Sequence, residues 1–199
     1  MKGVFIAIEG IDGSGKTTIA LKLKESLEEE GFQVYYTYEP SKGPIGDIIR
    51  KHVFNVEVRP NPYIEALLFA ADRIDHLEKE IIPALNRGNV VICDRYLYSS
   101  IAYQGARGVP INWIRRINVG VIKPHVTVYI DVPPEVGLSR KKGTKVVTFE
   151  NIDYLKAVRS IYLNLVRKGE MILVDGRMSI DEVLEKVLAN VKNILSLRG

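Results

Sequence analysis

The residues best suited to chemistry lie near the start of the chain, in a glycine-rich stretch that ends in lysine and threonine. From Gly10 to Thr17 the sequence fits the pattern Gly-x-x-x-x-Gly-Lys-[Ser/Thr], which is typical of a loop that binds a nucleotide triphosphate. An apolar run that fits a strand precedes the loop, and a helical stretch follows it, as the pattern requires. The loop does not decide whether the terminal phosphate is hydrolysed or passed to a second molecule.

Each part of this loop has a physical reason to be there. The glycines let backbone N–H groups turn toward phosphate oxygens, and the helix behind them adds its dipole. We expect Lys16 to reach the β- and γ-phosphates and Thr17 to ligate Mg²⁺ through its hydroxyl. The residues expected to bind ATP are Gly10, Ile11, Asp12, Gly13, Ser14, Gly15, Lys16, Thr17 and Thr18.

Asp12 places a carboxylate inside a loop built for anions, so it needs a hydrogen-bond donor. A donor could come from a sugar hydroxyl of a second substrate. The alternative is a surface aspartate in a turn.

The elements that position this loop form an α/β pattern. Five short runs are mostly apolar on both faces, as expected of strands buried between helices, and helical stretches alternate with them. The five runs are GVFIAIE, FQVYYTYE, NVVICD, VTVYIDV and EMILVD. This order predicts a five-stranded parallel sheet with helices on both faces, the three-layer fold of P-loop NTP hydrolases. We expect a single domain over residues 1–199, with a basic, glycine-containing segment at about 139–147.

Polar residues follow several of these strands, and ligands bind outside the carboxyl ends of strands in such sheets. Glu39 follows the second strand, Asp94 and Arg95 end the third, and Asp131 ends the fourth. Asp94 resembles an aspartate of the Walker B type, which supports Mg²⁺. Its alternative role is to cap the next helix.

A predicted helix over residues 62–81 offers a second binding face. Ala66, Phe69, Ala70 and Arg73 share one side of it by their spacing, and the two alanines leave room for a flat ligand. Phe69 could stack on a base and Arg73 could grip a phosphate. The alternative is a core phenylalanine and a surface arginine. Further along, Gln104 offers a donor and an acceptor that suit a base edge, or simply belongs to a polar helix start.

Composition narrows the class of protein. The net charge is +4 with no long Lys/Arg run, so we expect small phosphates rather than nucleic acid as partners. Cys93 is the only cysteine, which fits a reducing, cytoplasmic compartment. No apolar run approaches the ~20 residues of a membrane helix, and the apolar N-terminus is interpreted as a strand rather than a signal peptide.

The motifs together resemble the thymidylate kinases, a family of P-loop nucleoside monophosphate kinases. The resemblance runs from Lys2 to about Leu195 and rests on IEGIDGSGKTT, LLFAADR, VVICDRYLYSSIAYQG and VYIDVPPEVGLSR. It implies transfer of the ATP γ-phosphoryl group to dTMP, giving dTDP for dTTP synthesis, with Mg²⁺ as cofactor and a homodimeric enzyme. It also implies that adenine lies near the turn at residues 175–177.

The resemblance assigns roles to matching positions. Phe69 would stack on thymine, with Ser100 and Gln104 at the base. Asp12 would contact the 3′-hydroxyl, and Tyr103 would occupy the space of a 2′-hydroxyl. The implied acceptor-binding residues are Asp12, Arg50, Phe69, Arg73, Arg95, Ser100, Tyr103 and Gln104. The implied catalytic residues are Lys16, Asp94, Arg95 and Arg140, and the implied metal ligands are Thr17 and Asp94.

Arg73 and Arg95 would bind the phosphate of the acceptor, with Arg50 as a third candidate. Two departures from the family pattern bear on the phosphates. After the second strand the chain reads Glu39-Pro40-Ser41-Lys42-Gly43 rather than Glu-Pro-Gly-Gly-Thr, so a phosphate contact passes to Lys42 or is lost.

The second departure concerns the cation at the transferred phosphoryl group. In the family, the cation comes either from an arginine directly after the loop aspartate or from a lid. This chain has Gly13 at the position after Asp12. The short lid should therefore supply it, with Arg140 the best candidate because of its planar fork. Lys141, Lys142 and Lys145 are the alternatives.

Two other functions stay open at this point. One is a kinase for another nucleoside monophosphate or for a deoxynucleoside, which the phosphate loop alone does not exclude. The other is a P-loop ATPase switch, which would need neither a second anion site nor a basic lid.

Overall fold

A five-stranded parallel sheet forms the centre of the molecule. The computed structural model describes residues 3–54, 56–140 and 151–196. The strand order is β2-β3-β1-β4-β5, and every neighbouring pair is parallel, as predicted. The strands are β1 (Val4–Glu9), β2 (Val34–Tyr38), β3 (Val90–Asp94), β4 (Val126–Asp131) and β5 (Ile172–Asp175).

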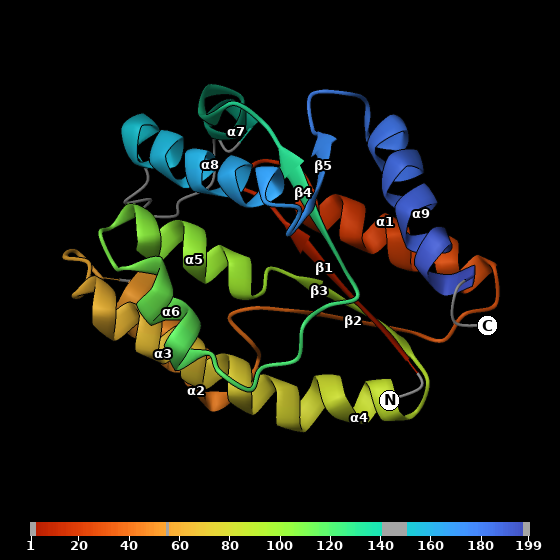
Figure 1. Cartoon of the computed structure of the whole chain (residues 1–199), viewed down its shortest axis with the longest axis horizontal. Helices are drawn as coiled ribbons and strands as arrows, with labels where there is room; N and C mark the ends of the chain where they lie inside the picture. The colour runs from red at the N-terminus through yellow and green to blue at the C-terminus, as the bar shows by residue number, and fades with distance from the viewer. Residues whose placement is uncertain (1–2, 55, 141–150, 197–199) are drawn as a thin grey trace.

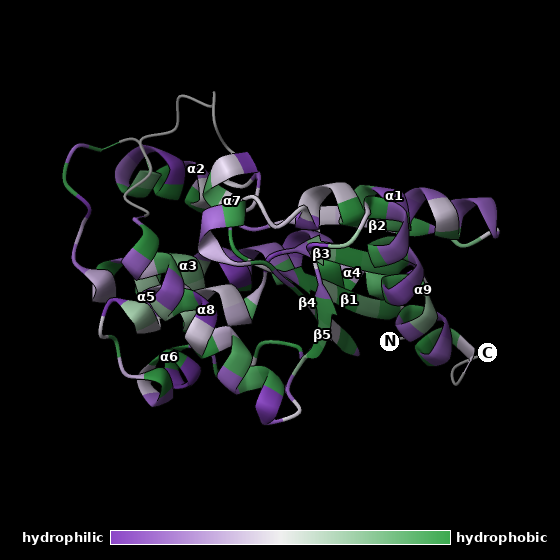
Figure 2. Cartoon of the chain, turned by 90° about the horizontal axis from the view of Figure 1, so that it is seen from above, coloured by the Kyte–Doolittle hydropathy of each residue, from purple (hydrophilic) through white to green (hydrophobic). Residues whose placement is uncertain are grey.

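Helices cover both faces of the sheet and create the three predicted layers (Figure 1). On one face α1 (Lys16–Glu29) and α9 (Ile180–Ser196) pack on alternate strand residues such as Ile6 and Ile8. On the other face, Phe5 and Ala7 of β1 pack against helical residues that include Leu77 and Ala84. The inner strands β1 and β3 are mostly apolar on both faces because both faces are buried. Figure 2 shows the sheet as the hydrophobic centre between the helical layers.

The remaining helices gather mainly beyond the second face and at the carboxyl edge of the sheet. They are α2 (Pro44–Ile49), the π-helical turn η1 (Arg50–Phe54), α3 (Pro62–His76), the π-helical turn η2 (Leu77–Ile81), α4 (Ile82–Asn86), α5 (Leu97–Ala106), α6 (Ile111–Ile117), α7 (Pro134–Arg140) and α8 (Ile152–Arg167). The predicted helix over residues 62–81 is thus α3 followed by η2. Within the described ranges, no helix is long and apolar enough to cross a membrane.

The predicted lid begins inside a helix. Ser139 and Arg140 are the last two residues of α7, so their backbone is helical rather than part of a loop. Lys141, Lys142, Lys145 and the rest of the predicted lid, up to residue 147, lie outside the described residues. Arg140 is therefore the one lid cation among the four candidates whose position the structure describes.

Candidate active site

The carboxyl edge of the sheet brings the phosphate loop and the end of β3 together. β1 and β3 are paired in parallel register, with Ile8 opposite Asp94, so both strands end at the same place. The loop then runs into α1, whose first residue is Lys16. The Lys16 ammonium is buried and lies 3.4 Å from the Asp12 carboxylate. Burial and the charge of Arg95 lower the pKa of Lys16, and Asp12 and Asp94 act in the opposite direction.

Thr17 and Asp94 meet across this edge, as the Walker B interpretation requires. The Thr17 hydroxyl donates a hydrogen bond to Asp94 Oδ2. The second oxygen, Asp94 Oδ1, is buried and makes no hydrogen bond. A buried carboxylate oxygen without a donor is costly, and a hydroxyl beside a carboxylate is a donor set that suits Mg²⁺. Asp94 does not cap the next helix, because Glu9 accepts the N–H groups at the start of α5.

Arg95 links the phosphate loop to α5. Its guanidinium donates from Nη1 to the Gly10 carbonyl oxygen over 3.0 Å and from Nη2 to the Asp12 carboxylate. It also lies 5.1 Å from the ring centre of Tyr103. Burial opposes the charge of Arg95, but Tyr103 and Asp12 outweigh it and hold the pKa well above the ordinary value. Asp12 therefore has cationic partners in this structure, and its contact with a sugar stays a prediction.

Arg73 is buried, so its alternative role as a surface charge is wrong. Only 1% of the residue is exposed. Its guanidinium donates to Glu39 Oε2 over 2.6 Å, to Ser100 Oγ over 3.0 Å and to Asn118 Oδ1 over 2.7 Å. These partners come from the end of β2, from α5 and from the end of α6. The structure thus brings Arg73 and Ser100, two predicted acceptor-binding residues, into direct contact.

Two predicted base-reading residues lie one helical turn from this pair, Phe69 before Arg73 in α3 and Gln104 after Ser100 in α5. Phe69 is half-buried, with its ring centre 6.2 Å from that of Phe54. Gln104 donates from Nε2 to the buried Glu65 carboxylate over 3.3 Å, while its Oε1 is buried without a partner. Arg73, Ser100 and Gln104 are all at most 3% exposed. The contact of a base with Phe69, Ser100 and Gln104 stays a prediction.

Another polar cluster lies close by, formed by Glu39, His76 and Cys93. Their ligand atoms lie within 4.8 Å of one another. Glu39 is already paired with Arg73, and Cys93 Sγ donates to the Arg95 carbonyl oxygen over 3.0 Å. Burial raises the pKa of the Cys93 thiol well above its ordinary value, which disfavours the thiolate that metals bind. We therefore treat this cluster as support for Arg73 and not as a metal site.

Comparison with known proteins agrees with this geometry. The sequence profile of the thymidylate kinase family matches residues 8–187. The chain belongs to the thymidylate kinase family. A probable thymidylate kinase of Staphylothermus marinus is 49% identical over 93% of this chain and 92% of its own length. A probable thymidylate kinase of Pyrococcus horikoshii is 42% identical over 98% of both chains, and a thymidylate kinase of Symbiobacterium thermophilum is 39% identical over 98% of this chain and 95% of its own.

Arg140 lies beside the phosphate loop, and its role as a donor-side cation stays a prediction. Its Nη1 lies 3.4 Å from the Gly13 carbonyl oxygen, and both terminal nitrogens lie 3.2 Å from the carbonyl oxygen of Gly176. The guanidinium thus lies between the phosphate loop and the turn after β5. That turn is the region where the resemblance places adenine.

The two weaker phosphate candidates are engaged elsewhere. Arg50 donates to the Asp47 carboxylate over 2.7 Å and to the Pro40 carbonyl oxygen over 3.1 Å. Lys42 lies with its ammonium 5.8 Å from the ring centre of Tyr38. Among the described residues, neither side chain has a hydrogen bond or ion pair with the phosphate loop. Binding of the acceptor phosphate by Arg50 or Lys42 stays a prediction.

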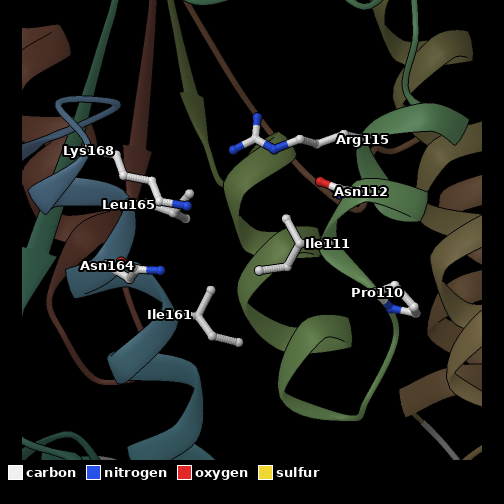
Figure 3. Close-up of a pocket in the computed structure, with 8 residues that line it drawn as sticks. All are labelled: Pro110, Ile111, Asn112, Arg115, Ile161, Asn164, Leu165 and Lys168. Carbon is white, nitrogen blue, oxygen red and sulfur yellow. The ribbon is translucent and has the colours of Figure 1, made fainter.

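A separate cavity of about 360 Å³ lies between α6 and α8 (Figure 3). Apolar residues that include Ile111 and Ile161 line it, and Arg115 and Lys168 lie at the same end. None of its lining residues is a predicted site residue of this thymidylate kinase fold. Arg115 is bound to Glu170 over 2.7 Å. This cavity is therefore distinct from the site of the phosphate loop.

Proposed function

We propose that this family member transfers the γ-phosphoryl group of ATP to dTMP, giving ADP and dTDP. The observation that carries the proposal is the position of Arg95, which touches the phosphate loop on one side and Tyr103 of α5 on the other. A second cationic site beside a phosphate loop suits an acceptor that already has a phosphate. The high identity to relatives named thymidylate kinases supports dTMP over another nucleotide.

The charges divide into a donor side and an acceptor side. Lys16 and Arg140 would offset the charge of the ATP phosphates, and Arg73 and Arg95 would bind dTMP. Phosphoryl transfer depends on alignment and charge neutralisation more than on covalent chemistry, so cations on both sides are what the reaction needs. The side chains of Lys16 and Arg95 are only 9% and 17% exposed, so water screens their charges less than it would at the surface.

Thr17 and Asp94 are the residues that would hold Mg²⁺. The unpartnered, buried Asp94 Oδ1 and the adjacent Thr17 hydroxyl fit an ion that prefers oxygen ligands. When bound, Mg²⁺ supplies positive charge that offsets the phosphate oxygens of ATP.

Binding of dTMP would rearrange Asp12. In this structure the Asp12 carboxylate accepts a hydrogen bond from Arg95 Nη2. A phosphate that carries two negative charges and matches the guanidinium fork would compete with it for Arg95. The displaced carboxylate would then accept a hydrogen bond from the 3′-hydroxyl of the deoxyribose. Tyr103, which lies under Arg95, would exclude a 2′-hydroxyl.

We also infer a homodimer that works in the cytoplasm. Ile64, Leu67 and Ile74 of α3 are 53%, 50% and 44% exposed, although all three are large and apolar. Their spacing places them along one side of the helix, and a second copy of the same face would cover them. The single cysteine, Cys93, is buried and reduced, which suits a reducing compartment.

An ADP-release assay with ATP and Mg²⁺ tests the proposal. We expect the highest kcat/KM with dTMP among dTMP, the other nucleoside monophosphates and thymidine. ADP release that does not depend on the acceptor would indicate an ATPase and contradict the second anion site. A preference for another acceptor would keep a kinase but overturn the assignment of the base-reading residues.

A further inference from the structure

We propose that Glu9 and Ser99 are positioning residues for Arg95. A chain of hydrogen bonds runs from the Glu9 carboxylate, through the Ser99 hydroxyl, to the Arg95 guanidinium. Neither Glu9 nor Ser99 is among the residues that the sequence motifs assign to ATP or dTMP. The inference rests on the proposed function, because it concerns the arginine that would bind the acceptor phosphate.

Glu9 is the last residue of β1 and is fully buried. Its carboxylate accepts four hydrogen bonds, from Tyr96 N over 3.0 Å, Ser99 N over 3.2 Å, Ser99 Oγ over 2.6 Å and Tyr162 OH over 3.0 Å. The N-cap residue of α5, Tyr96, makes no side-chain cap of its own. Glu9 thus accepts backbone N–H groups at the start of α5, although it belongs to β1. These hydrogen bonds fix α5 against the strand that leads into the phosphate loop.

The direction of the chain follows from the chemistry of its members. An arginine has donors and no acceptor, so in the contact of 3.1 Å between Arg95 Nη1 and Ser99 Oγ the serine must accept. The single hydroxyl proton of Ser99 is then directed to Glu9 Oε2, which is only 2.6 Å away. Burial raises the pKa of Glu9, whereas the hydrogen bonds from Ser99 and Tyr162 and the charge of Arg95 lower it. With four donors facing the carboxylate, it is the acceptor of the short contact with Ser99. Glu9 therefore orients the lone pairs of Ser99 toward Arg95.

The backbone of Arg95 also depends on the end of β1. Its φ is 70°, in the left-handed region that residues other than glycine rarely adopt. The Arg95 N–H donates to the Ile8 carbonyl oxygen over 2.9 Å, and the next N–H, of Tyr96, donates to Glu9. Residues persist in this region only where neighbouring contacts hold them. Ile8 and Glu9 thus hold the main chain around Arg95, while Ser99 holds its side chain.

Two variants test this relay of hydrogen bonds from Glu9 through Ser99 to Arg95. Each variant removes one hydroxyl group that donates to the Glu9 carboxylate. Ser99→Ala removes a hydroxyl that contacts both Glu9 and Arg95. Tyr162→Phe removes a hydroxyl that contacts Glu9 and Ser99 but not Arg95, and it keeps the ring that stacks on Tyr129 at 4.5 Å. We expect Ser99→Ala to lower kcat/KM for dTMP ~10-fold or more, because a misplaced reacting group costs that much or more, whereas Tyr162→Phe stays within about twofold. KM for ATP should stay constant in both.

Further variants separate the relay from folding and from the proposed function. Ser99→Thr keeps the hydroxyl and should restore most of the activity, and Glu9→Gln should lower kcat/KM for dTMP at least as much as Ser99→Ala. Equal losses in Ser99→Ala and Tyr162→Phe, with equal falls in Tm, would mean that the network only stabilises the fold and would overturn the relay. Arg95→Met is measured in parallel. If that variant keeps its affinity for dTMP, the assignment of Arg95 to the acceptor phosphate fails instead.

Discussion

Gly13 and Gly137 pack backbone against backbone, so α7 rests directly on the phosphate loop. A Cβ atom on Gly13 would lie 2.1 Å from the Gly137 carbonyl oxygen, and Gly13 has a φ of +77°. A Cβ atom on Gly137 would lie 2.6 Å from the Asp12 carbonyl oxygen. Neither position has room for a side chain. The same close approach brings Arg140, at the end of α7, to the Gly13 carbonyl oxygen, so a cation lies beside a loop that has no arginine of its own.

The first prediction is that Gly137→Ala impairs the donor side. The new methyl group meets the backbone of the phosphate loop, which gives way less readily than a side chain, so α7 must move and take Arg140 with it. We expect kcat to fall ~10-fold or more and KM for ATP to rise, measured by steady-state kinetics. Glu135→Ala is the matched control, because it alters the same helix at an exposed ion pair with Lys156. Wild-type kinetics in Gly137→Ala would refute the tight packing.

The second prediction concerns Arg140 itself. If its guanidinium acts on the transferred phosphoryl group, Arg140→Ala should lower kcat ~10³-fold while KM for dTMP changes little. Arg140→Lys should recover only part of the rate, because an ammonium lacks the planar fork. Arg116→Ala, at an exposed site on α6, serves as the control for loss of a positive charge. A change in KM alone would remove Arg140 from the chemistry.

The third prediction is that Arg73 has a role in folding as well as in binding. Arg73→Ala leaves Glu39 buried without its cation, which costs about 3–5 kcal/mol in typical buried pairs. Arg73→Lys keeps a charge beside Glu39 but loses the fork that contacts Ser100 and Asn118. We expect Arg73→Lys to fold and to bind dTMP at least tenfold more weakly in calorimetry, with unchanged affinity for ATP. A folded variant with normal dTMP affinity would contradict the role of Arg73.

The fourth prediction is that Asp94 sets the magnesium requirement. Asp94→Asn replaces a carboxylate by a neutral amide and leaves the size of the side chain unchanged. We expect a higher Mg²⁺ concentration for half-maximal rate and a lower rate at saturation, because an amide offers one weaker oxygen ligand. A titration of ADP release with Mg²⁺ measures both. The same Mg²⁺ dependence as in the wild type would show that Asp94 acts only as a partner of Thr17.

Local patterns predicted much of this molecule. The five apolar runs contain the five strands. The inner strands β1, β3 and β4 are mostly apolar because both of their faces are buried, whereas the edge strands β2 and β5 are partly exposed. The phosphate loop, Asp94 and Arg95 also meet as predicted, because parallel strands end at one edge.

Residues whose partners lie far away in sequence escaped such patterns. Arg73 is buried because Glu39 and Asn118 come to it from other elements, and a helical periodicity says nothing of them. Glu9 and Ser99 were missed for the same reason, although a glutamate at the end of a wholly apolar strand was a usable signal. Glu65 of α3 is a further example. Its two ion-pair partners are Arg59 and Arg107, and neither belongs to α3. Burial of a charge is decided by tertiary contacts, which the order of residues in one element does not reveal.

The fifth prediction addresses the exposed apolar side of α3. If a second copy covers Ile64, Leu67 and Ile74, then Leu67→Glu places a charge in the centre of that contact and should give a monomer at concentrations where the wild type is a dimer. Sedimentation velocity measures the mass of both. Ile180→Glu is the matched control, because Ile180 is an apolar residue that is 50% exposed and begins α9, which packs with α1 on the first face of the sheet, away from α3 (Figure 1). A dimer that persists in Leu67→Glu would place the interface elsewhere, and a monomeric wild type would contradict the inferred dimer.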